Sequence, residues 1–187
     1  RGISGLYHSF LPLVSEDEIS KSIIAQNPLV SQVGMQKIYP DRLKLTVVLL
    51  KPSVVIKIDS GYFVLASNGR VLAKVKEKPK VVPEVTYYQK LIGDQIELGD
   101  SVGFIDILTA ITFVNLANSL SQPVREVDIK GFHMIRLLLD GSRELLVTTE
   151  KDRAKQEYQI GAIIRQFKIQ GKEFKTIDVR FDKPVVT

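Results

Sequence analysis

The chain of 187 residues contains no cysteine and only two histidines, His8 and His133. The lack of cysteine excludes an internal disulfide framework and a metal site built on thiolates. It fits a reducing cytosol, and equally an exported protein that does not depend on disulfides. A zinc site would have to draw on carboxylates, and no ligand spacing supports one. We therefore expect no metal and no other cofactor.

Long apolar runs are also missing from the sequence. No stretch approaches the roughly 20 apolar residues that cross a bilayer, and no secretory signal peptide is visible. The sequence starts at Arg1 without a methionine. We interpret it as a fragment of a longer protein, which leaves room for an N-terminal membrane anchor outside it.

Catalytic motifs are lacking as well. A hydrolase needs a nucleophile, a base and an orienting group, but His133 falls in an alternating pattern that predicts a position on a sheet surface. Asp140-Gly141-Ser142 is typical of a hairpin turn, and the glycines match neither P-loop nor dinucleotide-binding spacing. Four acidic residues around a predicted helix start lack the spacing of a calcium loop, and helix capping or solvation explains them better. They are Asp94, Glu97, Asp100 and Asp106. We expect no enzymatic activity.

The charge of the chain is positive but dispersed. The formal net charge is +5 and the pI about 9.3, with basic residues spread along the sequence rather than gathered in one block. This pattern favours a generally basic surface over a nucleic-acid interface, and such a surface is compatible with an anionic membrane nearby. Apolar residues make up 44% of the chain, which is enough for a folded core.

The first 52 residues predict a small α+β unit. Ser15 and Glu18 have the spacing of a capping box, apolar residues at helical spacing follow, and Asn27-Pro28 ends the helix. The pattern then changes to a period of two, interrupted by a Pro40-Asp41 turn. Two strands are therefore expected, at residues 30–40 and 43–50.

Residues 53–187 predict a larger, mainly antiparallel sheet packed on two long helices. Asn-Gly and Asp-Ser-Gly turns separate three short strands, and a charged, proline-punctuated connector follows at residues 76–83. Three further strands lie between a helix around residues 104–117 and a second helix at residues 151–168. The fold class is therefore α+β.

The second helix should bury one side against the sheet. Gly161 would allow close approach of the helix to the sheet. The expected buried residues are Tyr158, Ile160, Ile163, Ile164 and Phe167.

A final strand is expected at residues 174–181, with Ile177, Val179 and Phe181 facing the second helix. Thr176, Asp178 and Arg180 should face water. A strand contributed last often lies at a sheet edge, which offers unpaired backbone N–H and C=O groups. Two interpretations are open. In the first, Arg180 and Asp182-Lys183-Pro184 protect the edge against pairing with another strand. In the second, the edge pairs with a strand of a partner protein.

Three segments in order resemble the FtsQ/DivIB family of bacterial cell-division proteins. In the first, Lys37, Tyr39-Pro40, Leu43 and Pro52 fill positions at the end of that family's POTRA domain. The segment YFVLASNGRVL resembles the next hairpin, and IDVRFDKPVV resembles the C-terminal segment of the family. Two departures stand out: residues 49–52 lack an acidic residue that is common there, and residues 1–14 do not show the strand and helix that begin a full POTRA domain.

The resemblance implies a POTRA-like domain, possibly incomplete, at residues 1–52 and a β domain at residues 53–187. It implies a non-enzymatic scaffold of the divisome that binds FtsB- and FtsL-type proteins by strand addition and helps to control septal peptidoglycan synthesis. The parent protein would be anchored in the cytoplasmic membrane by a single N-terminal helix, with this part on the extracytoplasmic side at the division septum.

The implied partner-binding residues lie mainly in the last strand, where Phe181 aligns with an aromatic position important for binding in the family. Arg165 and Lys168, late in the preceding helix, either attract acidic partner residues or remain a solvated helix face near the favourable helix dipole. The complete expected set is Thr176, Asp178, Arg180, Phe181, Asp182, Lys183, Pro184, Arg165 and Lys168.

Two alternatives remain. A POTRA-type chaperone or translocation module would guide client polypeptides by strand pairing. A hydrolase would be indicated by a pocket that holds His133 together with a serine and an acid. Neither a nucleic acid nor a small-molecule substrate is expected.

Overall fold

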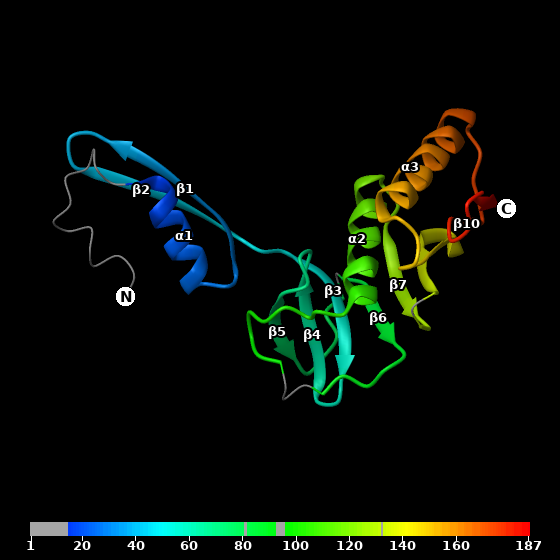
Figure 1. Ribbon diagram of the computed structural model, residues 1–187, viewed down its shortest axis with the longest axis horizontal. Helices are drawn as coiled ribbons and strands as arrows, with labels where there is room; N and C mark the ends of the chain where they lie inside the picture. Colours follow the sequence, from blue (N-terminus) through cyan, green and yellow to red (C-terminus); the bar gives the residue numbers. More distant parts are fainter. Residues whose placement is uncertain (1–14, 81, 93–95, 132) are drawn as a thin grey trace. The chain divides into compact units, whose positions relative to one another are not determined.

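A computed structural model describes residues 15–80, 82–92, 96–131 and 133–187. The chain divides into two compact units, Arg1–Lys51 (unit 1) and Pro52–Thr187 (unit 2), next to the boundary expected after residue 52. Figure 1 shows the elements of both units in sequence colours. Asp94 and residues 1–14, which include His8, lie outside the described residues.

Unit 1 has the helix and hairpin that its sequence predicts. Helix α1 (Glu16–Gln26) begins where the Ser15 hydroxyl accepts a hydrogen bond from the Glu18 amide at 3.4 Å, as the capping pattern indicates. The strands β1 (Val30–Ile38) and β2 (Arg42–Leu49) pair antiparallel. A carboxylate oxygen of Glu16 accepts from the Met35 amide at 3.1 Å, so the helix is fastened to β1.

Within its described residues, unit 2 is built on one mixed sheet of nine strands, in the order β11-β10-β9-β8-β7-β6-β3-β4-β5. The neighbours β3–β6, β6–β7 and β9–β10 are parallel, and the other five pairs are antiparallel. The α+β fold class is thus confirmed. The strands are β3 (Pro52–Ile58), β4 (Gly61–Ala66), β5 (Val71–Val75), β6 (Glu84–Tyr87), β7 (Val124–Ile129), β8 (Ile135–Leu139), β9 (Glu144–Val147), β10 (Thr176–Asp178) and β11 (Val185–Val186).

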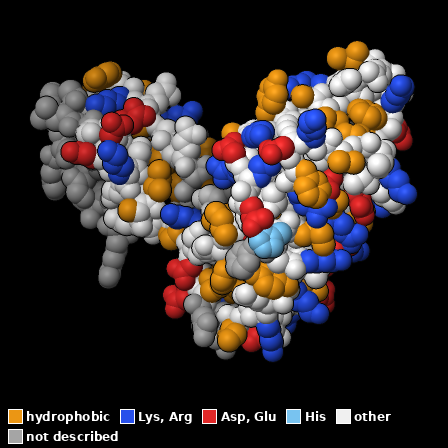
Figure 2. Space-filling model, turned by 45° about the vertical axis from the view of Figure 1, so that its right-hand side comes forward, with side chains coloured by type: hydrophobic (Ala, Val, Ile, Leu, Met, Phe, Trp, Pro, Cys, Tyr) orange, Lys and Arg blue, Asp and Glu red, His pale blue; other side chains and the backbone are white. Residues whose placement is uncertain are grey.

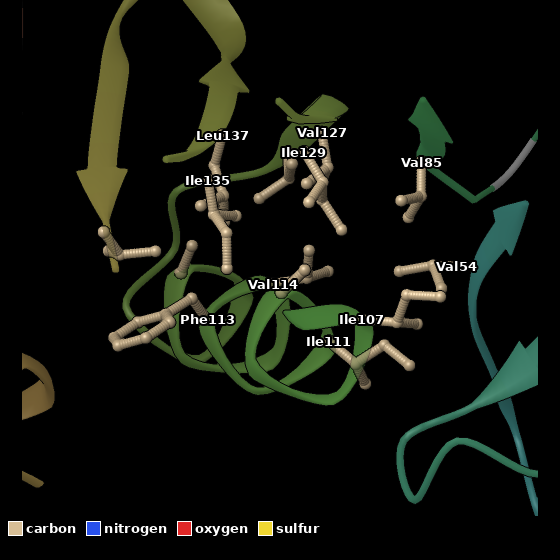
Figure 3. Close-up of a cluster of buried hydrophobic side chains, with 14 of the residues drawn as sticks. Val54, Val85, Ile107, Ile111, Phe113, Val114, Val127, Ile129, Ile135 and Leu137 are labelled. Carbon is tan, nitrogen blue, oxygen red and sulfur yellow. The ribbon is translucent and has the colours of Figure 1, made fainter. Parts of the chain in front are cut away.

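Two helices connect parallel neighbours in this sheet. Helix α2 (Ile105–Ser119) lies between β6 and β7, and α3 (Arg153–Gln170) lies between β9 and β10, as βαβ geometry requires for parallel strands. Both helices contribute to one core cluster with the sheet. Figure 3 shows Ile111 and Val114 of α2 directed at Val54, Val127 and neighbouring strand residues.

The expected buried side of the second helix needs one correction. Ile160 and Ile164 are buried, and Ile163 and Phe167 pack partly against the core, but Tyr158 is 72% exposed. Residues two apart on an α-helix point about 200° apart, so Tyr158 and Ile160 cannot face the same core.

The expectation for Gly161 is also wrong. The residue is buried, but a Cβ atom placed on it would lie nearest to the Arg165 guanidinium, at 3.7 Å, and not against a strand. The glycine therefore does not serve close packing of α3 on the sheet.

The acids near the start of α2 have structural roles, and one of them is buried rather than solvated. Asp100 accepts from the Glu97 amide at 2.9 Å. Asp106 is 1% exposed, and one of its carboxylate oxygens accepts from the Ile107 amide at 2.9 Å and from the Tyr87 hydroxyl at 3.3 Å. Burial is the main cause that raises the pKa of Tyr87.

The final strand differs most from the expectation. Instead of a single strand over residues 174–181, the chain forms the three-residue β10, turns, and returns as the two-residue β11. The expected edge strand is therefore an interior strand of the sheet.

Candidate partner-binding interface

Strand β10 has a neighbour on each side. Its residues pair in parallel with β9, Ile177 with Leu145, and antiparallel with β11, Ile177 with Val186. The backbone of residues 176–178 is thus not free for an added strand. The outermost strand at this end of the sheet is β11.

The register of β11 shows which backbone groups face outward. Thr176 and Thr187 exchange hydrogen bonds in both directions, at 3.3 and 3.1 Å. In an antiparallel pair, such hydrogen-bonded positions alternate with positions whose N–H and C=O groups point away from the neighbour. The adjacent residue Val186 therefore directs its N–H and C=O to the outer side. Pro184, the next outward position, has no N–H to donate.

The turn between β10 and β11 follows from a local interaction of Asp178. Its carboxylate accepts from the backbone amide of Arg180 at 3.1 Å and from the guanidinium of Arg180 at 2.9 and 2.6 Å. A side chain that bonds the amide two residues on forms an Asx turn, which ends a strand. Asp178 is only 8% exposed, so the expectation that it faces water is wrong. The arginine partner makes its burial possible.

The protonation of this pair favours the ionised state. Desolvation pushes the pKa of Asp178 upward, but the hydrogen bonds from the Arg180 side chain and amide, with the charges of Arg180 and Lys151, outweigh it, and the net shift is downward. The hydrogen bonds to Asp178 correspondingly raise the pKa of Arg180. The turn is therefore held by a charged pair across the neutral pH range.

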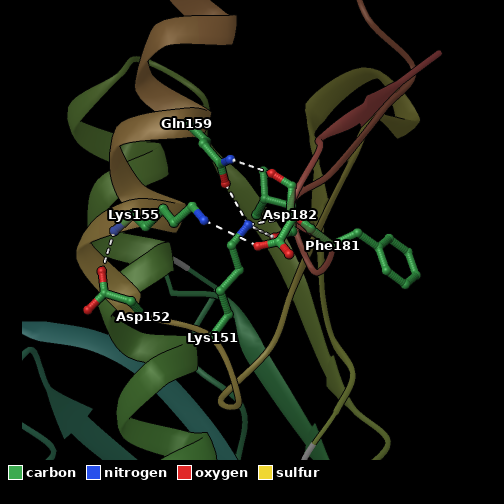
Figure 4. Close-up of polar contacts among 7 residues, drawn as sticks. Lys151, Asp152, Lys155, Gln159, Phe181 and Asp182 are labelled. Atoms are coloured by element: carbon green, nitrogen blue, oxygen red, sulfur yellow. Dashed lines mark hydrogen bonds and ion pairs between the residues drawn. The ribbon is translucent and has the colours of Figure 1, made fainter.

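Lys151 fastens the same turn from the other side, as Figure 4 shows. Its ammonium group donates to the backbone carbonyls of Val179 at 2.9 Å and Phe181 at 2.7 Å, and to the Gln159 side chain at 2.7 Å. Burial is the main cause that lowers the pKa of Lys151, with repulsion from Lys155 second.

Two residues of α3, one helical turn apart, add contacts to Asp182. The Lys155 ammonium lies 3.2 Å from the Asp182 carboxylate, and the Gln159 amide donates to the Asp182 carbonyl at 3.2 Å. Residues 179–184, which we call the C-terminal turn, are thus fixed to α3 by side chains spaced along one helix face.

Phe181 is directed away from the helix. The expectation that Phe181 is buried with Ile177 and Val179 is wrong, since its side chain is 58% exposed while the other two are fully buried. Figure 4 shows the ring pointing away from Lys151 and Gln159. The Arg180 guanidinium carbon lies 5.5 Å from the ring centroid, within cation–π range.

A hollow of about 510 Å³ adjoins this turn, lined by His133, Thr148, Glu150, Lys151, Arg180, Phe181 and Asp182. His133 lies in a turn rather than in a strand, and its Nδ1 atom is 2.6 Å from a Glu150 carboxylate oxygen. The lining of this hollow therefore contains a histidine, an acid and the Thr148 hydroxyl. The Thr148 hydroxyl accepts a hydrogen bond from the Glu150 backbone amide at 3.2 Å. Serine is absent from the described residues that line the hollow.

The nine residues expected to bind a partner lie in three parts of the fold. Asp178 and Thr176 belong to β10, and the C-terminal turn carries Arg180 through Pro184, with Asp182 and Lys183 exposed. Arg165 and Lys168 are exposed on α3 but do not line the hollow beside the turn. Lys168 instead lines a second hollow, near the start of β10.

The opposite end of the sheet is partly covered. At β5, the Val71 amide donates to the Asp100 carbonyl at 2.9 Å and the Val71 carbonyl accepts from the Gly99 amide at 2.8 Å. Only the later residues of β5 are left as an edge, and Lys74 is exposed there, a common device against strand pairing. Figure 2 shows basic and acidic side chains interspersed on one face of unit 2, without a large field of one sign.

Sequence reasoning missed several residues of this interface, above all Lys151, Gln159, Val185 and Val186. The valine pair after a Pro was a weak strand signal, because two residues carry no periodicity. Lys151 stood next to a helix start, where nothing local indicates its contacts with residues 179 and 181.

Within the part of the chain that the structure describes, no helix combines the length and the apolar character needed to cross a bilayer. No group of three or more His, Asp or Glu residues in that part lies close enough together to hold a metal ion. Comparison of the sequence with models of protein families and with curated proteins gives no match.

Proposed function

We propose that this chain is a scaffold of the FtsQ/DivIB type, without enzymatic activity, that binds FtsB- and FtsL-type division proteins by strand addition at β11. The observation that carries the proposal is the outward direction of the Val186 N–H and C=O groups on the outermost strand of the sheet. In this proposal the parent protein is anchored in the cytoplasmic membrane and acts at the septum, where it helps to control peptidoglycan synthesis.

Backbone pairing supplies affinity in strand addition, and neighbouring side chains select the partner. Val185 of β11 is 53% exposed, and Phe181 in the turn before this strand is 58% exposed, so two apolar side chains are available at the edge. Aromatic residues are enriched at protein interfaces relative to the rest of the surface. The adjoining hollow contributes His133, Lys151 and Arg180 as basic groups and Glu150 and Asp182 as acidic groups, a mixed set that suits a polar partner segment.

Short backbone pairing alone would bind weakly, because β11 offers one residue with both groups outward and Pro184 limits extension. The proposal therefore needs Phe181 and the hollow as part of the same interface. This differs from pairing along residues 176–181, which the sequence favours, because β11 covers β10 there.

The test is a calorimetric titration of the chain with the extracytoplasmic segment of an FtsB-type protein from the same source. Val186→Pro removes the outward N–H, and proline is tolerated on an edge strand when the lost donor faces solvent. Val186→Ala is the matched control because it keeps the N–H. A proline at Asp178 would not be informative, since Asp178 pairs with Val185 inside the sheet.

We expect binding to the parent and to Val186→Ala, and at least about tenfold weaker binding to Val186→Pro. Phe181→Ala should also weaken binding by about tenfold or more, as for an anchor residue. Equal binding to all variants would place the partner away from β11. No binding to the parent would contradict the divisome proposal for this chain.

Unit 1 supports a second candidate, the POTRA-type chaperone or translocation module. On strand β2, the exposed residues Val47 (48%) and Leu49 (61%) point to the same face, because side chains alternate along a strand. They form a surface that an extended client segment can cover. Val47→Lys together with Leu49→Lys should abolish binding of an unfolded client such as reduced, carboxymethylated lactalbumin. Retention of client binding in this variant would exclude β2 as the client site.

A further inference from the structure

The second hollow of unit 2, of about 250 Å³, lies at the other end of the β9–β10 pair from the C-terminal turn. It is lined by Arg143, which precedes β9, and by Phe174, which precedes β10. The hollow beside the C-terminal turn is lined by residues that follow the same two strands. Because β9 and β10 are parallel, the two hollows lie at opposite strand ends and are separate sites.

The floor of this second hollow is apolar. Ile164 and Phe174 are each 4% exposed, and Leu120 and Phe167 are partly buried beside them. The Phe167 and Phe174 rings meet edge to face, with centroids 6.0 Å apart and an interplanar angle of 87°. This geometry is favourable for aromatic pairs and gives the floor a fixed shape.

Three cations surround the floor. Lys168 and Lys172 are exposed at the end of α3, and Arg143 is half-buried with its guanidinium carbon 5.2 Å from the Phe174 centroid. The Arg143 Nε donates to the Asp140 carbonyl at 3.0 Å, which holds the side chain in place. Among the described residues, no carboxylate forms a salt bridge with Arg143, Lys168 or Lys172, although Glu173 also lines the hollow.

A polar acceptor in the same lining lacks a donor. The side-chain oxygen of Gln122 is inaccessible to water and has no hydrogen-bond partner. Such unsatisfied atoms are uncommon in folded proteins. The last torsion of a glutamine side chain has a broad, shallow preference, so the amide of Gln122, which lines the hollow, can rotate to meet a donor that enters it.

We propose that this second hollow is a docking site for a peptide segment in which one aromatic or branched apolar side chain is flanked by carboxylates. The apolar side chain lies on Phe167 and Phe174, the carboxylates pair with Lys168, Lys172 and Arg143, and a backbone N–H donates to Gln122. The volume is below the roughly 300–1,000 Å³ of pockets that take drug-sized ligands, and it suits a single side chain. A phospholipid acyl chain has no N–H to donate, which favours a peptide.

The test uses a blocked tripeptide with phenylalanine between two aspartates, titrated into the ¹⁵N-labelled chain. Two control peptides change one feature each: alanine replaces the phenylalanine, or lysines replace the aspartates. We expect the acidic phenylalanine peptide to shift the amide resonances of Leu120, Gln122 and Phe174. We also expect it to bind at least about tenfold more tightly than either control.

Charge reversal tests the site itself. Lys168→Glu with Lys172→Glu should weaken binding by about fivefold or more. Lys76→Glu with Lys80→Glu is the matched control, since these exposed lysines are also four residues apart and lie outside the hollow. It should leave affinity within about twofold, the change expected from net charge alone.

Three results would overturn the proposal. Equal weakening in both double variants would show attraction by net charge only. Equal binding of the phenylalanine and alanine peptides would show that the apolar floor is unused. Retention of the parent chain on phosphatidylglycerol vesicles, lost with Lys168→Glu and Lys172→Glu, without peptide binding, would assign the cations to a lipid surface. None of these results bears on the Val186→Pro titration, so this inference and the proposed function fail separately.

Discussion

Replacing Lys151 by methionine should loosen the C-terminal turn while leaving the side-chain stem in place. Methionine has nearly the length of lysine and is apolar, so the packing of the stem is kept. Lost are three hydrogen bonds from the ammonium group, to the carbonyls of Val179 and Phe181 and to the Gln159 side chain.

The size of the effect follows from what each acceptor can do afterwards. Phe181 is 58% exposed, so water can replace the ammonium at its carbonyl, and Gln159 is half-buried. Val179 is fully buried, and its carbonyl loses a charged donor, a change worth about 1–3 kcal/mol. Burial lowers the pKa of Lys151, so desolvation of the ammonium already offsets part of the gain. We expect Lys151→Met to lower the free energy of unfolding by about 1–3 kcal/mol.

Urea denaturation followed by far-ultraviolet circular dichroism measures this loss, with Lys155→Met as the matched control. The Lys155 partner Asp182 is highly exposed, and exposed ion pairs contribute at most about 1 kcal/mol. Hydrogen exchange should also accelerate in residues 179–187 of Lys151→Met before it does in β8. Equal destabilisation by the two variants, or unchanged hydrogen exchange in residues 179–187, would refute the role of Lys151 in holding the C-terminal turn.

Further predictions concern acid stability, glycines and the faces of α3. Because the folded pKa of Asp178 lies below its ordinary value of 3.8, its ionised form stabilises the fold above that pH, and this contribution is lost on acidification. Asp178→Asn should therefore destabilise the chain at pH 6, and the difference from the parent, measured by urea titration, should shrink near pH 2.5. Gly61→Ala would place a Cβ atom 2.3 Å from the Val75 carbonyl at φ 140° and should cost at least about 2 kcal/mol. Gly171→Ala, at φ 62° with no heavy atom within 4 Å, should cost only about 1 kcal/mol, and similar losses in the two variants would contradict this reading. Ile160→Ala should cost about 2–5 kcal/mol and Tyr158→Ala less than about 0.5 kcal/mol in the same assay, and the opposite order would mean that Tyr158 is the buried residue.

The elements with a clear local signal were predictable from the sequence. The capping pattern at Ser15 and the Asn-Gly and Asp-Gly turns predict a helix and several hairpins that the structure confirms. The sheet order was not predictable, because parallel pairs such as β6 with β7 join segments far apart in the chain and leave no local pattern. Strand β6, with four residues after a charged connector, was missed for the same reason.

At the interface, the alternating pattern of apolar residues predicted the burial of Ile177 and Val179 correctly, and it gave the wrong exposure for Asp178 and Phe181. It failed at Asp178 because burial there depends on the specific pairing with Arg180, which ends the strand. The pattern was wrong for Phe181 because this residue lies after the end of β10, where the chain is no longer extended and side chains no longer alternate with a period of two. A reading of Asp178 as an Asx turn, followed by Pro184, would have indicated a chain reversal.

The strand order imposes a sequence of assembly on this end of unit 2. Strand β11 pairs with β10 alone, β10 needs β9, and the connection from β9 to β10 runs through the whole of α3. Strand pairs that are far apart in the sequence form late, because closing the loop between the two strands costs conformational entropy before their contacts can stabilise the pair. During synthesis the outward edge therefore appears only after β9 and β10 have paired. Intermediates that still lack β10 cannot present β11, so a partner that recognises this edge would distinguish finished molecules from unfinished ones.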